Sequence, residues 1–218
     1  LRKAFVETYP EVRFTQTERD ANEIVSALRR AEIDVALTYD LMMPSDLTFI
    51  PLIELPPFVL ISAEHPLADH DEIMVEELKA LPMVLLDLPL SSDYFLSFFL
   101  EKGIKPEIAE RSRDIAVVRS LVANGFGYSI ANLRPLNGLS PDGKKLRFIP
   151  LAGSPRPMKI GLLLLPRAET THVVARFVDF AQNWVRDGFT PDGFARQLSG
   201  PQAQPTSATT EKTTPPES

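Results

Sequence analysis

Hydrophobic and polar positions alternate in blocks along the chain, and the spacing within each block predicts short strands separated by helices. Residues 12–17 alternate apolar Val12 and Phe14 with polar Arg13 and Thr15, the pattern of a half-buried strand. Behind Asp20, residues 21–30 repeat apolar side chains every three to four positions, the pattern of an amphipathic helix. A second apolar strand is expected at residues 34–39. Strand, helix and strand over this length predict a parallel βαβ unit.

The same periodicities predict the elements of the rest of the chain. Pro56 and Pro57 should end one strand, because proline lacks the N–H that a ladder needs. Further strands are expected at residues 47–55, 58–62, 83–86, 108–112, 145–150 and 158–165. Further helices are expected at residues 1–8, at 75–81, from Ser91 or Ser92 to Gly103 with Phe95, Phe98 and Phe99 on one face, and at 170–186 with Val174, Phe177, Val178, Ala181 and Trp184 buried.

The segment 112–130 predicts a helix that runs directly into a strand. Asp114 can accept a hydrogen bond from the free N–H groups that open a helix. Asn124 and Gly125 can end that helix, because Gly adopts the left-handed conformation at low cost. A tight passage from helix to strand, with open helix ends near a cleft, is typical of ligand-binding α/β proteins.

Two successive series of strands and helices favour an α/β protein with two lobes and a cleft between them, each lobe built on a mixed, mainly parallel sheet. Residues 191–218 change character, since they are rich in Pro, Ser and Thr and almost free of large apolar side chains. Such a segment cannot bury enough surface to offset its ordering entropy, so a disordered tail is expected.

Composition narrows the possible functions. A net charge of −6 argues against nucleic-acid binding by this chain alone, because phosphate contacts require a basic face. The chain has no Cys, which excludes disulfides, thiolate metal sites and Cys nucleophiles. Apolar runs stay far below the ~20 residues of a membrane helix, so no membrane partner is expected. Residues 1–8 read as the later part of a helix, and we expect a further segment upstream of Leu1.

The sequence offers little catalytic chemistry. Gly127–Ala131 approximates a nucleophile elbow around Ser129, with Asp142 and His172 following in hydrolase order. That elbow requires a strand before the serine and a helix after it, and the expected order here is the reverse. The three His residues are scattered, and dinucleotide and P-loop motifs are missing from the sequence. We therefore expect a binding protein, not an enzyme, without cofactor or metal.

Four segments resemble motifs of the effector domain of LysR-type transcriptional regulators. Tyr9–Val12 is similar to the family's entry into an early strand, and Ser26–Leu37 to its passage from helix to strand. Ile61–Ala68 is similar to its His-Pro-Leu-Ala turn, and Leu121–Gly127 to its Val-Ala-x-Gly-x-Gly signature. The four occur in the family's order, and the resemblance covers residues 1–185.

The resemblance implies two Rossmann-like lobes in an arrangement like that of type-2 periplasmic binding proteins. Residues 1–60 and 158–190 would form the first lobe, and residues 61–157 a second lobe inserted into it. The family's function would make the chain the effector-sensing and oligomerisation domain of a cytoplasmic transcription regulator. A small effector, by family default an organic acid, would bind between the lobes. DNA would be contacted only through an N-terminal winged helix-turn-helix, which this chain does not contain. The alternative is a periplasmic solute-binding protein, which shares the fold.

The family binds its effector at helix starts and strand ends that face the cleft. Open helix starts present unpaired N–H groups and the positive end of the helix dipole, which suit an anion. For Asp20, Ser91 and Ser92, helix capping is as good an explanation as ligand contact, and Arg113 could pair with an effector or lie on a solvated face. The candidate ligand-binding residues are Thr17, Asp20, Asn22, Thr38, Leu90, Ser91, Ser92, Ser112, Arg113 and Asn132. The resemblance also implies a homodimer or higher homo-oligomer, in which the helix from Asn22 to Arg30 packs against the neighbour's second lobe.

Overall fold

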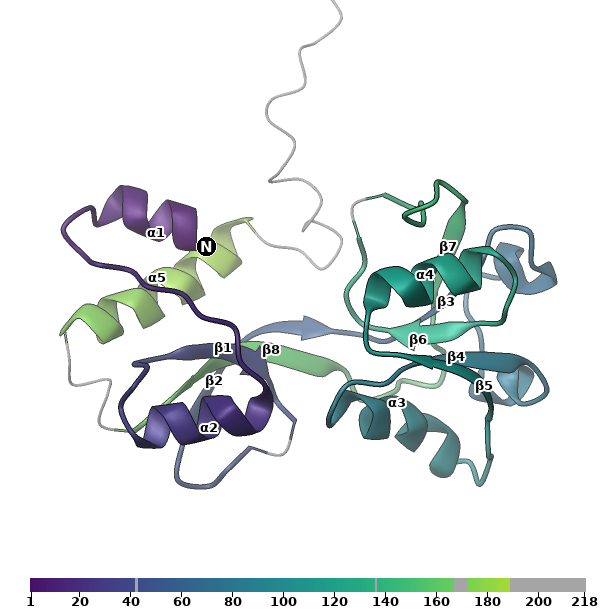
Figure 1. Ribbon diagram of the computed structural model, residues 1–218, viewed down its shortest axis with the longest axis horizontal. Coiled ribbons are helices and arrows are strands. Elements are labelled where there is room, and N and C mark those ends of the chain that lie inside the picture. The colour runs from purple at the N-terminus through teal and green to yellow at the C-terminus, as the bar shows by residue number, and fades with distance from the viewer. Residues whose placement is uncertain (42, 136, 167–171, 189–218) are drawn as a thin grey trace, which may run out of the picture.

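The computed structural model describes residues 1–41, 43–135, 137–166 and 172–188. These residues form two lobes that lie side by side and are joined by two extended crossovers (Figure 1). One crossover passes through Pro56 and Pro57, between β2 (Thr48–Leu55) and β3 (Phe58–Ser62), and the other leads from Leu151 into β8 (Met158–Leu164). The described helices include none that is long and apolar enough to cross a membrane.

The first lobe is a three-stranded sheet covered by helices on both faces. Its strands are β1 (Ala36–Tyr39), β2 and β8, and its helices are α1 (Arg2–Thr8), α2 (Ala21–Arg29) and α5 (His172–Gly188). The strand order is β1-β8-β2, with β8 antiparallel to both neighbours. Leu162 and Leu164 of β8 pack against α1 and α5 on one face, while Leu163 packs with Leu28 of α2 on the other. The alternation of side chains along β8 therefore fills both halves of this lobe's core.

The second lobe contains the larger core and five strands. Its elements are β3, the 3-10 turns η1 (Pro66–Asp69) and η2 (Val75–Leu78), β4 (Pro82–Leu86), α3 (Ser91–Leu100), β5 (Glu107–Ser112), α4 (Ile115–Ala123), β6 (Ser129–Ala131) and β7 (Leu146–Pro150). β4 is parallel to β5, and β3 is antiparallel to β6 and β7. Tyr128 joins β6 to β4 in a parallel sense, since its N–H donates to the Pro82 carbonyl at 3.0 Å and its carbonyl accepts from Val84 at 2.7 Å. The spatial order is therefore β5-β4-β6-β3-β7.

Local sequence signals place the helices where expected. Asp20 accepts from the N–H of Glu23 at 2.9 Å, and the Glu23 carboxylate accepts in return from the Asp20 N–H, which completes a capping box. Asp114 caps α4 through the N–H of Ala116 at 2.7 Å. Gly125, with φ of +83°, ends α4 in the left-handed conformation. These three predictions from the sequence are confirmed.

Several expectations about the strands are wrong. Residues 12–17 form no strand with any described partner, so the predicted βαβ unit is not made. Apolar alternation favours an extended chain, but a strand also requires a neighbour to pair with, which a local pattern does not specify. The sheets are mainly antiparallel, because β8 and β3 each run against both of their neighbours.

Smaller corrections concern boundaries and burial. The helix expected at 75–81 is only a 3-10 turn at Val75–Leu78. Trp184 is half-buried where full burial was expected. The division between lobes expected at residue 60 falls inside β3, all of which pairs within the second lobe's sheet. The expected tail at 191–218 lies outside the described residues.

Candidate functional site

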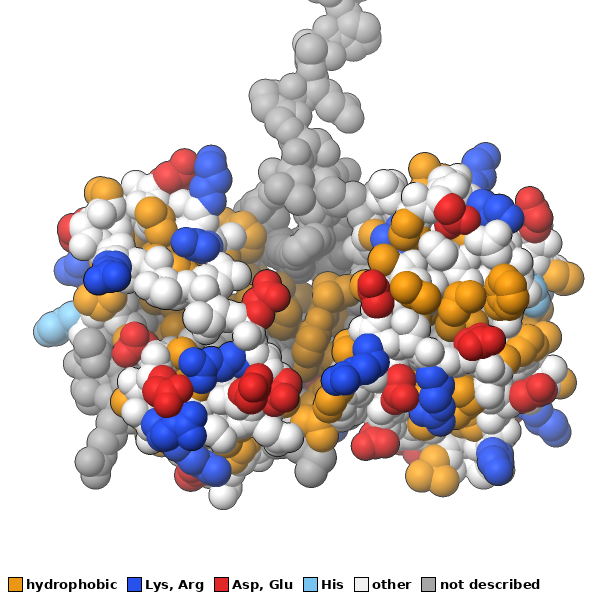
Figure 2. Space-filling view, in the orientation of Figure 1, with side chains coloured by type: hydrophobic (Ala, Val, Ile, Leu, Met, Phe, Trp, Pro, Cys, Tyr) orange, Lys and Arg blue, Asp and Glu red, His pale blue; other side chains and the backbone are white. Residues whose placement is uncertain are grey.

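The candidate residues of the second lobe come together at one edge of its sheet. β5, β4 and β6 are parallel to one another, so their carboxyl ends lie at the same edge. Ser112 ends β5, Asn132 follows β6, and the segment Leu88–Ser92 follows β4. The N–H of Asp87 donates to the Ser112 carbonyl at 2.8 Å, which fixes the first two strand ends side by side. This edge faces the first lobe, and the surface between the lobes is hollowed (Figures 1 and 2).

The start of α3 differs from the starts of α2 and α4. Leu90 precedes α3 with a left-handed φ of 66°, and its side chain gives no capping hydrogen bond. A non-glycine residue in this conformation carries backbone strain of about 1 kcal/mol or more. Ser91 and Ser92 are half-buried in the first turn, and within the described chain no side chain caps this helix. The capping explanation for the two serines is therefore not supported. The N–H of Ser92 donates to the Leu88 carbonyl at 3.1 Å, so the N–H groups of Ser91 and Asp93 are the donors left at the positive end of the helix dipole.

The junction after β5 is occupied by local hydrogen bonds. The Ser112 hydroxyl accepts from the N–H of Asp114 at 3.1 Å, and Asp114 itself caps α4. Arg113 between them is exposed. Its neighbour Arg111 pairs with Asp87 at 3.2 Å, across the ends of β5 and β4. The hydroxyl of Ser112 is thus engaged in the turn, while Arg113 extends from it as a solvent-accessible cation.

Asn132 lies deepest among the candidates and connects different parts of the fold. It is 8% exposed. Its side-chain Nδ2 donates to the carbonyl of Leu55 at 2.6 Å and to the hydroxyl of Tyr94 at 3.2 Å. Its Oδ1 is buried and has no hydrogen-bond partner among the described residues. A buried acceptor left in this state costs free energy, so its retention requires an explanation.

The candidates of the first lobe are less closely grouped. Thr17 and Asn22 are exposed at the start of α2, and Asp20 is committed to the capping box. α2 begins on the side of the first lobe that faces the second (Figure 1). Thr38 is half-buried in β1 opposite Gly161 of β8. Thr17 and Asn22 are therefore the exposed candidates at this end of α2.

Sequence reasoning missed Asp40, Tyr94 and Arg156, which are joined by hydrogen bonds between the end of β1 and α3. Asp40, directly after β1, accepts at Oδ1 from the N–H of Lys159 at 2.8 Å and at Oδ2 from Arg156 at 3.0 Å. Tyr94, in the first turn of α3, donates its hydroxyl hydrogen to the Arg156 carbonyl at 2.8 Å. Burial raises the pKa of Tyr94, so its hydroxyl stays protonated at neutral pH. These partners lie 62 to 119 positions apart in the sequence, a separation that leaves no local signal.

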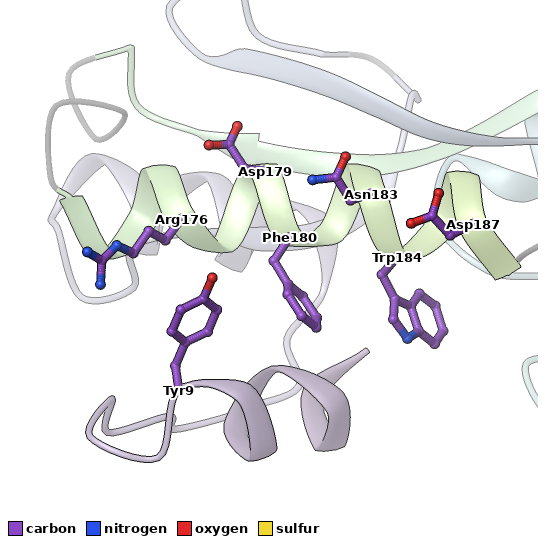
Figure 3. A pocket seen from close by; sticks show the side chains of 7 residues that line it. All are labelled: Tyr9, Arg176, Asp179, Phe180, Asn183, Trp184 and Asp187. Atoms are coloured by element: carbon purple, nitrogen blue, oxygen red, sulfur yellow. The ribbon is translucent and has the colours of Figure 1, made fainter.

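A second concavity lies within the first lobe, between α1 and α5 (Figure 3). It encloses about 380 Å³ and is lined by Tyr9, Arg176, Asp179, Phe180, Asn183, Trp184 and Asp187. The rings of Tyr9 and Phe180 are 6.1 Å apart, and the guanidinium of Arg176 lies 6.0 Å from the Tyr9 ring centroid. Its lining includes none of the candidate residues, and it belongs to the packing of two helices in one lobe.

The structure also bears on catalysis. Ser129 opens β6 behind α4, so the order is helix then strand, and its hydroxyl is buried. That arrangement is the reverse of a nucleophile elbow and leaves the serine inaccessible to a substrate. His65 accepts from the N–H of Leu67 at 3.1 Å and caps η1, in the segment that resembles the family's His-Pro-Leu-Ala turn. Within the described ranges, His, Asp and Glu side chains form no group of three that could hold a metal ion.

Comparison with known proteins shows which protein family has this architecture. The family model described as "LysR substrate binding domain" matches residues 1–186. The HTH-type transcriptional regulator CysB of Haemophilus influenzae is 31% identical over 128 residues, which are 58% of this chain and 40% of CysB. The chain covers 40%, 50% and 44% of the length of three curated relatives that it matches, CysB among them.

Solved structures agree with that assignment. A putative LysR family transcriptional regulator of Pseudomonas aeruginosa, the PA01 protein, superposes with a TM-score of 0.79 at 31% identity, over 84% of this chain and 67% of that one. The effector-binding domain of QuiR in complex with shikimate superposes with a TM-score of 0.72 at 20% identity, over 87% of this chain and 90% of that one, which shows a shared fold.

These findings confirm the two-lobed fold expected from the sequence, and they do not favour the periplasmic transport alternative, because the relatives are regulators of transcription. The chain belongs to the LysR substrate-binding domain family.

Proposed function

We propose that the chain senses a small organic anion bound between its lobes and thereby modulates transcription. The observation that carries this proposal is the meeting of three segments, Leu90–Ser92, Ser112–Arg113 and Asn132, at the carboxyl ends of three parallel strands that face the first lobe. Ligands of α/β proteins collect at such strand ends. QuiR, which shares the fold, is named as binding shikimate, a carboxylate.

The three helix starts around the hollow differ in what they can offer an anion. α2 and α4 are already capped by the carboxylates of Asp20 and Asp114. α3 has no such cap in the part of the chain that is described. An effector carboxylate at Ser91 and Ser92 would accept from their hydroxyls and from the N–H of Ser91, since the Ser92 N–H already donates to the Leu88 carbonyl, and it would interact favourably with the helix dipole. Arg113 would add a cation, and Thr17 and Asn22 would close the site from the first lobe.

Sensing requires that the ligand distinguish two arrangements of the lobes. A ligand shifts an equilibrium only by its difference in affinity for the two states. An effector held by α3 on one side and by Thr17 and Asn22 on the other would bind the arrangement with close lobes more tightly, because it contacts both lobes only in that arrangement. We propose that the change is passed to a DNA-binding domain in a longer, cytoplasmic protein, as the names of the relatives as HTH-type regulators suggest.

We propose that the chain acts as a homodimer. The exposed face of α4 supports this, since Val117 is 45% exposed and Phe126 beyond the helix end is 54% exposed, and both line one surface together with Leu121. Apolar side chains gathered on one surface are typical of an interface. The first-lobe helix α2 of the neighbour, Asn22 to Arg30 in the sequence prediction, is the proposed partner for this surface.

Substitution of the α3 start tests the effector site. Ser91→Leu with Ser92→Leu should abolish binding of small carboxylates, shikimate among them, in isothermal calorimetry, because the leucines remove two hydroxyls and block the N–H groups. Ser45→Leu is the matched control. Ser45 is exposed next to Asp46, which pairs with Arg29 at the far end of α2. If a carboxylate that binds the parent chain bound the folded double variant with undiminished affinity, the proposed site would be wrong.

A further inference from the structure

The hydroxyl of Tyr94 stands at the centre of a set of contacts that joins α3 to both crossovers. It accepts from Asn132 Nδ2 at 3.2 Å, and Asn132 also donates to the carbonyl of Leu55, the last residue before the Pro56–Pro57 crossover. The same hydroxyl donates to the carbonyl of Arg156, in the crossover that leads into β8. We call Tyr94, Asn132, Leu55, Arg156 and Asp40 the Tyr94 cluster.

The Tyr94 cluster continues into the first lobe through Asp40. The Arg156 side chain donates to Asp40 Oδ2 at 3.0 Å and to the Asp40 carbonyl at 3.3 Å. The Asp40 side chain is 14% exposed, and it also accepts a hydrogen bond from the N–H of Lys159 at the start of β8. A continuous chain of hydrogen bonds therefore runs from α3 of the second lobe to the end of β1 in the first.

The hydrogen bonds of this set fit one another chemically. A phenol has one hydrogen to donate and lone pairs to accept, and Tyr94 uses both, one toward each crossover. Asn132 presents both of its donor contacts from a buried position. Buried polar contacts of this kind favour one arrangement of the groups they join, and here the contacts are made by the Tyr94 hydroxyl and the Asn132 Nδ2, while the Asn132 Oδ1 takes no part. Tyr39 and Leu41, on either side of Asp40, pack against the second lobe's core and support the same arrangement.

We propose that Tyr94 and Asn132 are positioning residues that fix the angle between the lobes by holding the start of α3 to both crossovers. Tyr94 is three residues after Ser91 and so lies on the same side of α3, one turn away. A ligand that draws the helix start toward the first lobe moves the Tyr94 hydroxyl, and with it the two crossover carbonyls. This coupling to a ligand rests on the proposed function, whereas the hold on the unliganded lobes rests on the contacts alone.

The absence of Cys from the sequence allows a direct measurement of the angle. Cysteines introduced at exposed Lys3 and Lys79, one in each lobe, would carry spin labels for a distance distribution in the unliganded chain. Tyr94→Phe removes the hydroxyl and keeps the ring. Tyr128→Phe makes the same change at a tyrosine that is 1% exposed and whose hydroxyl has no hydrogen-bond partner among the described residues.

We expect Tyr94→Phe to broaden the distance distribution or shift its centre, and Tyr128→Phe to leave it as in the parent. Asn132→Ala should reproduce the effect of Tyr94→Phe, and the double variant should add little, because both residues act through one network. A distribution unchanged by Tyr94→Phe, or changed equally by both Tyr→Phe substitutions, would overturn the proposal. Because no effector is present, neither result depends on whether the proposed ligand site is correct.

Discussion

Gly127, two residues before β6, lies directly against the backbone of Pro82 at the start of β4. Its φ is +144°, and a Cβ added there would lie 2.1 Å from the carbonyl oxygen and 2.8 Å from the carbonyl carbon of Pro82. Pro82 is held by the N–H of Tyr128 at 3.0 Å, directly beside the clash. Because the obstacle is backbone and not a flexible side chain, Gly127→Ala must move one strand away from the other.

The magnitude follows from two separable costs. An L-residue in a positive-φ conformation costs about 1–2 kcal/mol. Separating β6 from β4 also leaves a buried backbone donor or acceptor unpaired, at about 1–3 kcal/mol for each group. Gly125 is the matched control without the clash, since its φ of +83° is also positive and a Cβ there would meet nothing within 4 Å. We therefore expect Gly127→Ala to lower the free energy of unfolding by about 2 kcal/mol more than Gly125→Ala does.

Urea denaturation monitored by circular dichroism measures the free energies of unfolding of the two variants. The comparison requires that both have the same dependence of that free energy on urea concentration. Equal losses for Gly125→Ala and Gly127→Ala, within about 0.5 kcal/mol, would refute the steric argument. A second consequence concerns the candidate site, because β6 carries Asn132 at its carboxyl end. Moving β6 should also shift Asn132 away from Tyr94 and weaken the Tyr94 cluster.

Two further predictions concern charge and assembly. Hydrogen bonds from Arg30, and then from Arg19, lower the pKa of Glu32 to about 2. A carboxyl group with a lowered pKa stabilises the fold at pH values above its ordinary pKa of 4.5, and this stabilisation is lost as the pH falls toward 2. The urea midpoint of Glu32→Gln should therefore fall less steeply with acidification than that of the parent chain. The same pH dependence in both chains would contradict this. Val117→Glu should convert the proposed dimer to monomer in sedimentation equilibrium, whereas Leu100→Glu, at an apolar residue 77% exposed on α3, should not. Dissociation by both substitutions, or by neither, would remove α4 from the proposed interface.

Local signals made α2, α3 and α4 predictable. Asp20 and Asp114 each act within three residues of themselves, so their capping roles can be read from adjacent sequence. Phe95, Phe98 and Phe99 are buried on one face of α3 as their spacing predicts. Because a helix satisfies its own backbone hydrogen bonds, its position depends little on distant segments.

Strand partners and the candidate site depended on distant segments and were predicted less well. Residues 12–17 have the apolar alternation of a strand but no partner strand among the described residues. The alternation alone does not indicate whether a partner strand exists. The sequence identified Asn132 only as a strand end, and it gave no indication of Asp40 or Arg156. These two residues meet across 116 positions of chain, and the meeting follows from the crossovers and not from any periodic pattern.

The place of β8 between β1 and β2 also determines the order in which the chain can fold during synthesis. β3 to β7 occupy residues 58–150 without interruption, so the second lobe emerges from the ribosome with all of its strands available. β1 and β2 emerge earlier but share no ladder with each other, and they must wait for residues 158–164 to supply the strand between them. Domains fold as units during translation, and unpaired strand edges invite aggregation until they are covered. A nascent chain stopped before Met158 should therefore hold a folded second lobe beside two strands that have nothing to pair with.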